Sequence, residues 1–197
     1  MSVRRRVTGA LRRWRALLAG GALLAALCVR VPARLHAELH FPAHAPADIA
    51  HHLADFSNQP GITSWRVTED RSNYTTWQYA VQFTCGARCG GTAWVVAHDE
   101  PAPGGPRHGR NARRHRVALR ARVCSAPPLL PWPRLCEELE VEGSVWADAA
   151  AGARLRLQWL RRCGALGWLR GACGRELRAD RDARRAALSA APHAVRL

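Results

Sequence analysis

The chain has 197 residues, enough for one leader segment and one domain of common size but cramped for two full domains. All 30 basic residues are arginine, against 15 acidic residues, and the formal net charge is +15. Eight arginines precede residue 35 and every acidic residue follows it, so the remainder carries 22 minus 15, or +7. This distribution indicates a cationic leader and a moderately basic domain, and we expect no nucleic acid partner.

Residues 1–34 have the order of a secretory signal, with a basic stretch, an apolar run over residues 16–29 and a mixed segment. The apolar run is shorter than the roughly 17 to 25 residues of a comfortable membrane span. Small residues allow cleavage after Ala33 or Ala37. An uncleaved signal anchor would instead keep the N-terminus cytoplasmic, because the arginines precede the run. The leader therefore predicts a domain in the secretory pathway, either secreted or held by a single-pass membrane anchor.

A mitochondrial transit peptide is the rival interpretation, since the first 37 residues are rich in arginine and contain no acid. Two later features favour the secretory pathway. Asn73 begins an N-glycosylation sequon, Asn73-Tyr74-Thr75. Six cysteines follow the leader, and in an oxidising compartment they would pair, with neighbour pairing the simplest of the 15 connectivities. They are Cys85, Cys89, Cys124, Cys136, Cys163 and Cys173.

Alternation of apolar and polar residues predicts β-strands through most of the domain. A strand over 35–41 precedes a helix over 46–56, and a second helix over 174–190 closes the domain. Each strand has one apolar and one polar side, so we expect an α+β fold with an antiparallel sheet of six to seven strands, covered on one face. The strands after the first helix are expected at 62–68, 74–84, 92–98, 117–123, 139–146 and 154–160.

Two proline-rich breaks, 101–116 and 126–133, interrupt the pattern of strands. The first is predicted to be an exposed basic loop. It either contacts phosphates or anionic lipid headgroups, or is a solvated loop in an arginine-biased chain. Its basic residues are Arg107, His108, Arg110, Arg113, Arg114, His115 and Arg116.

Two stretches carry a family resemblance. Residues 39–56, with Leu-His-Phe-Pro, Ala-Pro-Ala-Asp-Ile and Leu-Ala-Asp-Phe, resemble the first strand and helix of the START-like helix-grip superfamily, which includes polyketide-cyclase-like and coenzyme Q-binding proteins. Residues 152–159 are similar to its penultimate strand. The resemblance covers residues 35–190 and leaves 191–197 as a tail. It implies a sheet curved around the C-terminal helix, with an apolar cavity between them for a lipid or another hydrophobic ligand.

Four aromatic residues at positions expected to face inward are the candidate ligand-binding residues: Trp77, Tyr79, Trp94 and Trp159. Such a stripe either lines a cavity or forms plain core. We expect a noncatalytic domain that binds a hydrophobic small molecule or lipid and needs no cofactor. An extracellular interaction domain with a filled core and a mitochondrial lipid or quinone chaperone are the alternatives.

Motifs for catalysis or metal binding are missing from the sequence. It contains no G-x-S-x-G, no glycine-rich phosphate loop after a strand and no H-E-x-x-H. His36, His40 and His44 recur every four residues, but the strand alternation around them breaks the geometry of a helical metal site. The first two post-leader cysteines with His98 suggest zinc, although an oxidising compartment favours a disulfide there. We therefore expect no catalytic residue and no metal.

Overall fold

A computed structural model of the chain describes residues 14, 15, 17–22, 29–101, 113–126, 135–148, 152–164 and 171–190. Much of the predicted leader and parts of both proline-rich breaks lie outside these ranges. Within them, none of the helices combines the length and apolar character needed to span a membrane.

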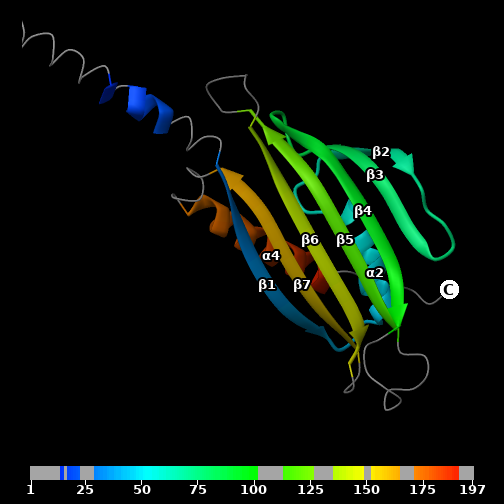
Figure 1. Ribbon diagram of the computed structural model, residues 1–197. Helices are drawn as coiled ribbons and strands as arrows, with labels where there is room; N and C mark the ends of the chain where they lie inside the picture. Colours follow the sequence, from blue (N-terminus) through cyan, green and yellow to red (C-terminus); the bar gives the residue numbers. More distant parts are fainter. Residues whose placement is uncertain are drawn as a thin grey trace, which may run out of the picture.

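The described residues form an α+β domain in which one antiparallel sheet carries its helices on a single face (Figure 1). Neighbouring strands follow the order β1-β7-β6-β5-β4-β3-β2. This confirms the predicted α+β class, the antiparallel sheet and the C-terminal helix. The strands are β1 (Arg30–Phe41), β2 (Ser64–Asp70), β3 (Thr76–Thr84), β4 (Cys89–Pro101), β5 (Arg113–Ser125), β6 (Leu135–Ala147) and β7 (Ala153–Gly164). The helices are α2 (Pro46–Ala54), the short 3-10 helix η1 (Phe56–Asn58) and α4 (Ala172–Ala190).

The core lies between the sheet and its helices. Alternate residues of the strands turn toward α2 and α4, and Val81, Val145, Leu155 and Leu157 are buried there almost completely. At Gly143, a Cβ atom would lie 3.3 Å from Leu157 Cδ2 and 3.4 Å from Leu53 Cδ1 of α2. Glycine at this position therefore lets α2 pack directly against the middle of the sheet.

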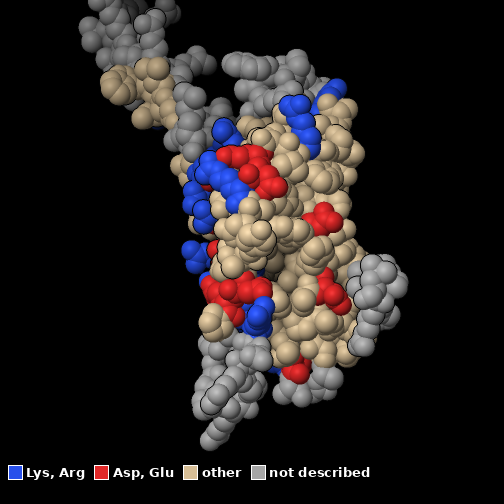
Figure 2. All heavy atoms as spheres, turned by 90° about the vertical axis from the view of Figure 1, so that its right-hand side faces the viewer, with Lys and Arg blue, Asp and Glu red and all other residues tan. Residues whose placement is uncertain are grey.

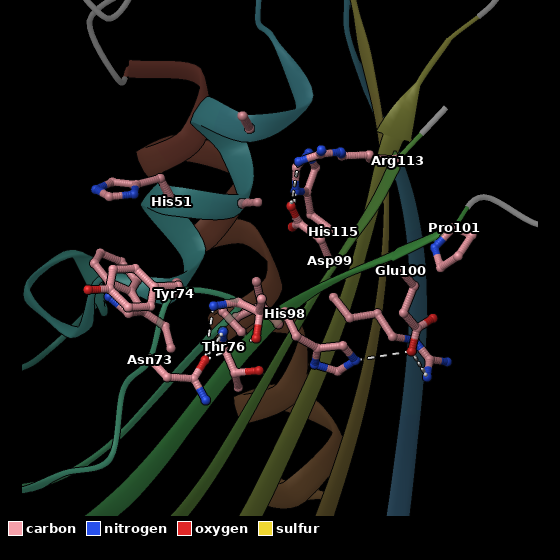
Figure 3. A pocket seen from close by; sticks show the side chains of 18 residues that line it. His51, Asn73, Tyr74, Thr76, His98, Asp99, Glu100, Pro101, Arg113 and His115 are labelled. Carbon is pink, nitrogen blue, oxygen red and sulfur yellow. Dashed lines mark hydrogen bonds and ion pairs between the residues drawn. The ribbon is translucent and has the colours of Figure 1, made fainter. Parts of the chain in front are cut away.

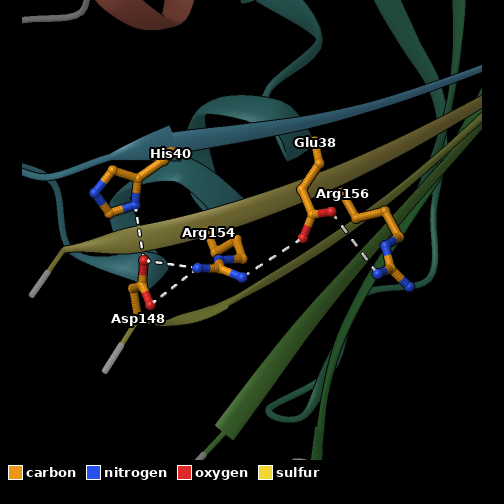
Figure 4. Close-up of polar contacts among 5 residues, drawn as sticks. All are labelled: Glu38, His40, Asp148, Arg154 and Arg156. Carbon is orange, nitrogen blue, oxygen red and sulfur yellow. Dashed lines mark hydrogen bonds and ion pairs between the residues drawn. The ribbon is translucent and has the colours of Figure 1, made fainter. Parts of the chain in front are cut away.

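The other face of the sheet is covered by charged side chains that compensate one another. Figure 4 shows one such group, in which Asp148 accepts from His40 at 3.0 Å and from Arg154 at 3.2 Å. Glu38 lies 3.9 Å from the guanidinium groups of both Arg154 and Arg156. Opposite charges on neighbouring strands stabilise the register of a solvated sheet face modestly.

A view from the β2 and β3 side shows some basic and acidic residues in mixed clusters and others singly, separated by uncharged surface (Figure 2). On this face the described residues therefore form no broad patch of a single sign.

Several observed strands extend beyond their predicted bounds, and two of them continue through segments that look irregular in sequence. β1 begins at Arg30, inside the predicted leader, because its first residues pair with the end of β7, from Arg30 opposite Gly164 onward. β5 begins at Arg113, inside the predicted loop 101–116, where Arg113 lies opposite Pro101. Cross-strand ion pairs allow this basic stretch to extend the sheet.

Candidate functional site

Within the part of the chain that the structure describes, two hollows on the helix side of the sheet are candidate sites. The inner cavity, of about 250 Å³, is partly open and is lined by residues of β3 to β7, η1, the turn after η1 and α4. Most of its wall is apolar, and its charged residues gather toward α4. The apolar wall includes Phe56, Ile62, Phe83, Leu119, Ala121, Val123 and Leu139.

The charged end of the inner cavity is a set of ion pairs between the sheet and α4. The guanidinium of Arg161 donates to Glu137 Oε2 at 2.9 and 2.7 Å and also pairs with Glu176 of α4. Arg184, only 7% exposed, donates from Nε to Asp180 Oδ2 at 2.9 Å. Since each cation has an acidic partner, this end adds polarity to the cavity but little net charge.

The rim cleft is the second hollow, of about 760 Å³, between α2, the hairpin joining β2 to β3, and the paired ends of β4 and β5. In Figure 3, His51 projects from α2, Asn73, Tyr74 and Thr76 come from the hairpin, and Asp99 and His115 stand on the β4 and β5 side. Small side chains of α2 leave the space open. They are Ala47, Ala50 and Ala54.

Two compensated groups border the rim cleft on opposite faces of β4: Asp99 stands on the helix side, whereas His98 and Glu100 share the face of Trp94. Asp99 binds His115 Nδ1 at 2.6 Å and lies 3.6 Å from Arg113. Glu100 binds His98 Nε2 at 3.0 Å, and this hydrogen bond, together with the nearby Arg116, lowers the pKa of the Glu100 carboxyl. Each acid lies beside an arginine, so this end of the cleft favours polar but uncharged partners.

The aromatic side of the rim cleft is formed by Trp77, which remains 41% exposed. Its ring lies 4.9 Å from the ring of His51, with the two planes tilted by 38°. Tyr74, at the tip of the hairpin, is fully exposed. Large aromatic side chains left in water often mark a surface that contacts another group.

The four predicted aromatic residues do not form one site. Trp77 lines the rim cleft. Tyr79, two residues further along β3, donates from its hydroxyl to Ala54 O at 2.5 Å and accepts from Phe56 N at 3.0 Å. Burial raises the pKa of this hydroxyl. Tyr79 thus fastens the junction of α2 and η1 to the sheet.

Trp159 and Trp94 line neither hollow. Trp159 is 1% exposed and donates from Nε1 to Asp180 of α4 at 2.8 Å, so it belongs to the core. The expectation that Trp94 faces inward was wrong, because it pairs in register with Ala80 and Arg120 on the face away from the helices. There it is 37% exposed, beneath the guanidinium of Arg71.

The six post-leader cysteines pair with their neighbours in sequence. Cys85 is bonded to Cys89, Cys124 to Cys136, and Cys163 to Cys173. Three disulfides are typical of proteins in the secretory pathway or outside the cell, in agreement with the predicted compartment. Asn73, the predicted glycosylation site, is exposed at the hairpin turn.

The other predicted candidates are dispersed. Arg107, His108 and Arg110 lie outside the described residues, while Arg113, Arg114, His115 and Arg116 form the start of β5. Over the described ranges, no three histidine, cysteine, aspartate or glutamate side chains converge as metal ligands do.

Both hollows contain residues that sequence reasoning missed. Glu137 of β6 and Arg161 of β7 occupy inward positions at which the other residues of these strands are apolar. A charged residue at such a position is a signal that the sequence does contain. His51 and Asp99 carried no signal, because their significance depends on pairing with Trp77 and His115.

Comparisons with known proteins assign neither family nor function. No family model matches the chain, and no curated protein matches it significantly. Among solved structures, a conserved protein from Geobacillus kaustophilus aligns with 12% identity over 81% of this chain and 96% of its own length. Its TM-score of 0.35 is too low to establish a shared fold.

Proposed function

We propose that this chain is a noncatalytic, START-like domain that binds a small hydrophobic molecule in the inner cavity, within the secretory pathway or outside the cell. The main support is the cavity itself, which has an apolar wall and lies between the sheet and the C-terminal helix. The resemblance noted in residues 35–190 implies a cavity in this place.

The size of the inner cavity limits the ligand. Its volume of about 250 Å³ falls just below the range of roughly 300 to 1,000 Å³ that is usual for ligand pockets. A short aliphatic or single-ring compound, or one end of a longer lipid, fits this volume. Because Arg161 and Arg184 already have acidic partners, we expect affinity to come from apolar contact more than from charge.

The proposed domain is either secreted after cleavage of its leader or held at the membrane by an uncleaved leader. Cleavage after Ala33 or Ala37 would remove the first four or eight residues of β1, all of which pair with β7. N-terminal sequencing of the protein from cells, with a test of membrane association, distinguishes a secreted chain from a single-pass anchored one.

The binding proposal is tested with the full chain produced in a eukaryotic secretory system. Native mass spectrometry after mild extraction should detect a bound hydrophobic molecule, and an apolar fluorescent probe should be displaced by short alkanols. Ala121 lines the inner cavity, so Ala121→Leu should fill part of it and weaken probe binding by about tenfold.

Ala118→Leu is the matched control, because Ala118 lies on the same strand but faces away from the helices. It should leave probe binding unchanged. A folded protein that carries no lipid and binds no probe would contradict the proposal and favour the alternative of an interaction domain with a filled core.

A further inference from the structure

The rim cleft differs from the inner cavity in the chemistry that it offers. An exposed indole and the small side chains of α2 form one side, and hydrogen-bonding groups with balanced charge form the other. A saccharide has the matching properties, since the C–H groups of its ring pack on an aromatic face and its hydroxyls bond to polar side chains. It is also uncharged, as the compensated pairs of Asp99 with Arg113 and His115 favour.

A glycosylation sequon lies at the rim of the cleft. Asn73 lines it and begins the sequon, four residues before Trp77. The Asn73 side-chain oxygen accepts hydrogen bonds from Thr75 N at 2.9 Å, Thr76 N at 2.8 Å and the Thr75 hydroxyl at 3.0 Å. These bonds fix the carboxamide through its oxygen. The glycan would be attached to the other atom of the group, Nδ2.

The rest of the hairpin supports the same occupant. Tyr74, the middle residue of the sequon, is fully exposed, and Trp77 retains 41% of its surface. Asn73 and Trp77 both line the rim cleft, so a glycan attached at Asn73 starts at the edge of the hollow that contains the indole. Figure 3 shows Asn73 and Tyr74 together on the hairpin.

We propose that the Asn73-linked glycan folds back into the rim cleft and packs its first sugars against Trp77. The inference rests on glycosylation at Asn73 and is independent of ligand binding in the inner cavity. The glycan would shield His51 and the exposed indole from solvent and from other proteins.

The proposal is tested by labelling histidines with diethyl pyrocarbonate and quantifying each one by peptide mass spectrometry. Thr75→Ala removes the sequon, whereas Thr75→Ser preserves it and is the matched control. An aromatic contact of ordinary strength favours the packed glycan by about fivefold, so His51 should react about fivefold faster in Thr75→Ala than in Thr75→Ser. His36, exposed on the opposite face of the sheet, should react equally in both.

A second pair of variants separates packing on Trp77 from simple crowding by the glycan. When Trp77→Ala is added to both Thr75 variants, the fivefold difference in the rate of His51 labelling should disappear. The proposal is overturned if a glycosidase leaves the mobility of the native protein unchanged, if His51 reacts equally with and without the glycan, or if the difference persists without Trp77.

Discussion

Asp180 is expected to be a sensitive polar residue of the domain, because one of its carboxylate oxygens accepts hydrogen bonds from both the sheet and α4. Its Oδ2 accepts from Trp159 Nε1 at 2.8 Å and from Arg184 Nε at 2.9 Å. Trp159 and Arg184 are 1% and 7% exposed, whereas the Asp180 side chain is 22% exposed. The donors are therefore more deeply buried than their acceptor.

The cost of Asp180→Ala follows from the groups that it leaves behind. An unpaired buried arginine costs about 3 kcal/mol, the lower end of the range because Asp180 is partly open to water. The indole N–H without an acceptor adds about 1 kcal/mol. We expect the free energy of unfolding to fall by about 4 kcal/mol in total. Asp180→Asn retains an acceptor for Trp159 and should cost about half as much.

The assay is urea unfolding of the oxidised protein, followed by circular dichroism with the disulfides intact. Arg184→Met added to Asp180→Ala should restore about 2 kcal/mol, because it removes the unpaired buried charge. Asp182→Ala is the control on the same helix. Asp182 pairs with Arg181 at the surface, so its loss should leave the midpoint of urea unfolding almost unchanged. Equal costs for the two aspartates, or no rescue by Arg184→Met, would refute the reasoning.

Three further predictions concern other parts of the fold. Tyr79→Phe should lower the free energy of unfolding by about 1 to 2 kcal/mol in the same urea assay, because Phe56 N–H loses its acceptor; an unchanged midpoint would contradict this. Replacing both Cys163 and Cys173 by alanine opens a loop with a sequence separation of 10 and should cost roughly 3 kcal/mol, measured by thermal unfolding against the oxidised parent. Burial lowers the pKa of His52 from its ordinary value of 6.5, so the unfolded chain takes up the proton first and stability should decline as pH falls below about 6.5. His52→Gln should flatten that decline in urea titrations at several pH values, and an unaltered profile would exclude His52 as its source.

The aromatic residues show how far the candidate site was predictable. Trp77 lines a hollow, whereas Trp159 is core, and nothing in their local patterns distinguishes the two roles. The difference arises from their neighbours. Trp159 lies beneath α4, but Trp77 lies beside the small residues of α2, which leave its ring half exposed. Whether a side chain lines a cavity depends on the distance between its strand and the neighbouring helix. The sequence of one strand does not contain this distance.

Trp94 was misplaced for a related reason. On β4, Ala93, Val95 and Ala97 alternate with Thr92, Trp94 and Val96, so both sides of the strand contain apolar residues. Alternation alone does not select the buried side of such a strand. Pairing with β3 and β5 selects it, because Ala93 then joins Val81 and Ala121 in the core while Trp94 lies beside Arg120.

The sequence by itself determined the class of fold and the order of strands and helices along the chain, because these depend on short-range alternation, and its even number of post-leader cysteines predicted their pairing. Tertiary structure decided where β1 and β5 begin, since strand ends are set by partners far away in the chain. It also decided which residues meet at each hollow, such as Arg161 with Glu137 and Asp99 with His115. Contacts across the sheet and between sheet and helix form only when the layers pack, so one strand read alone does not contain them.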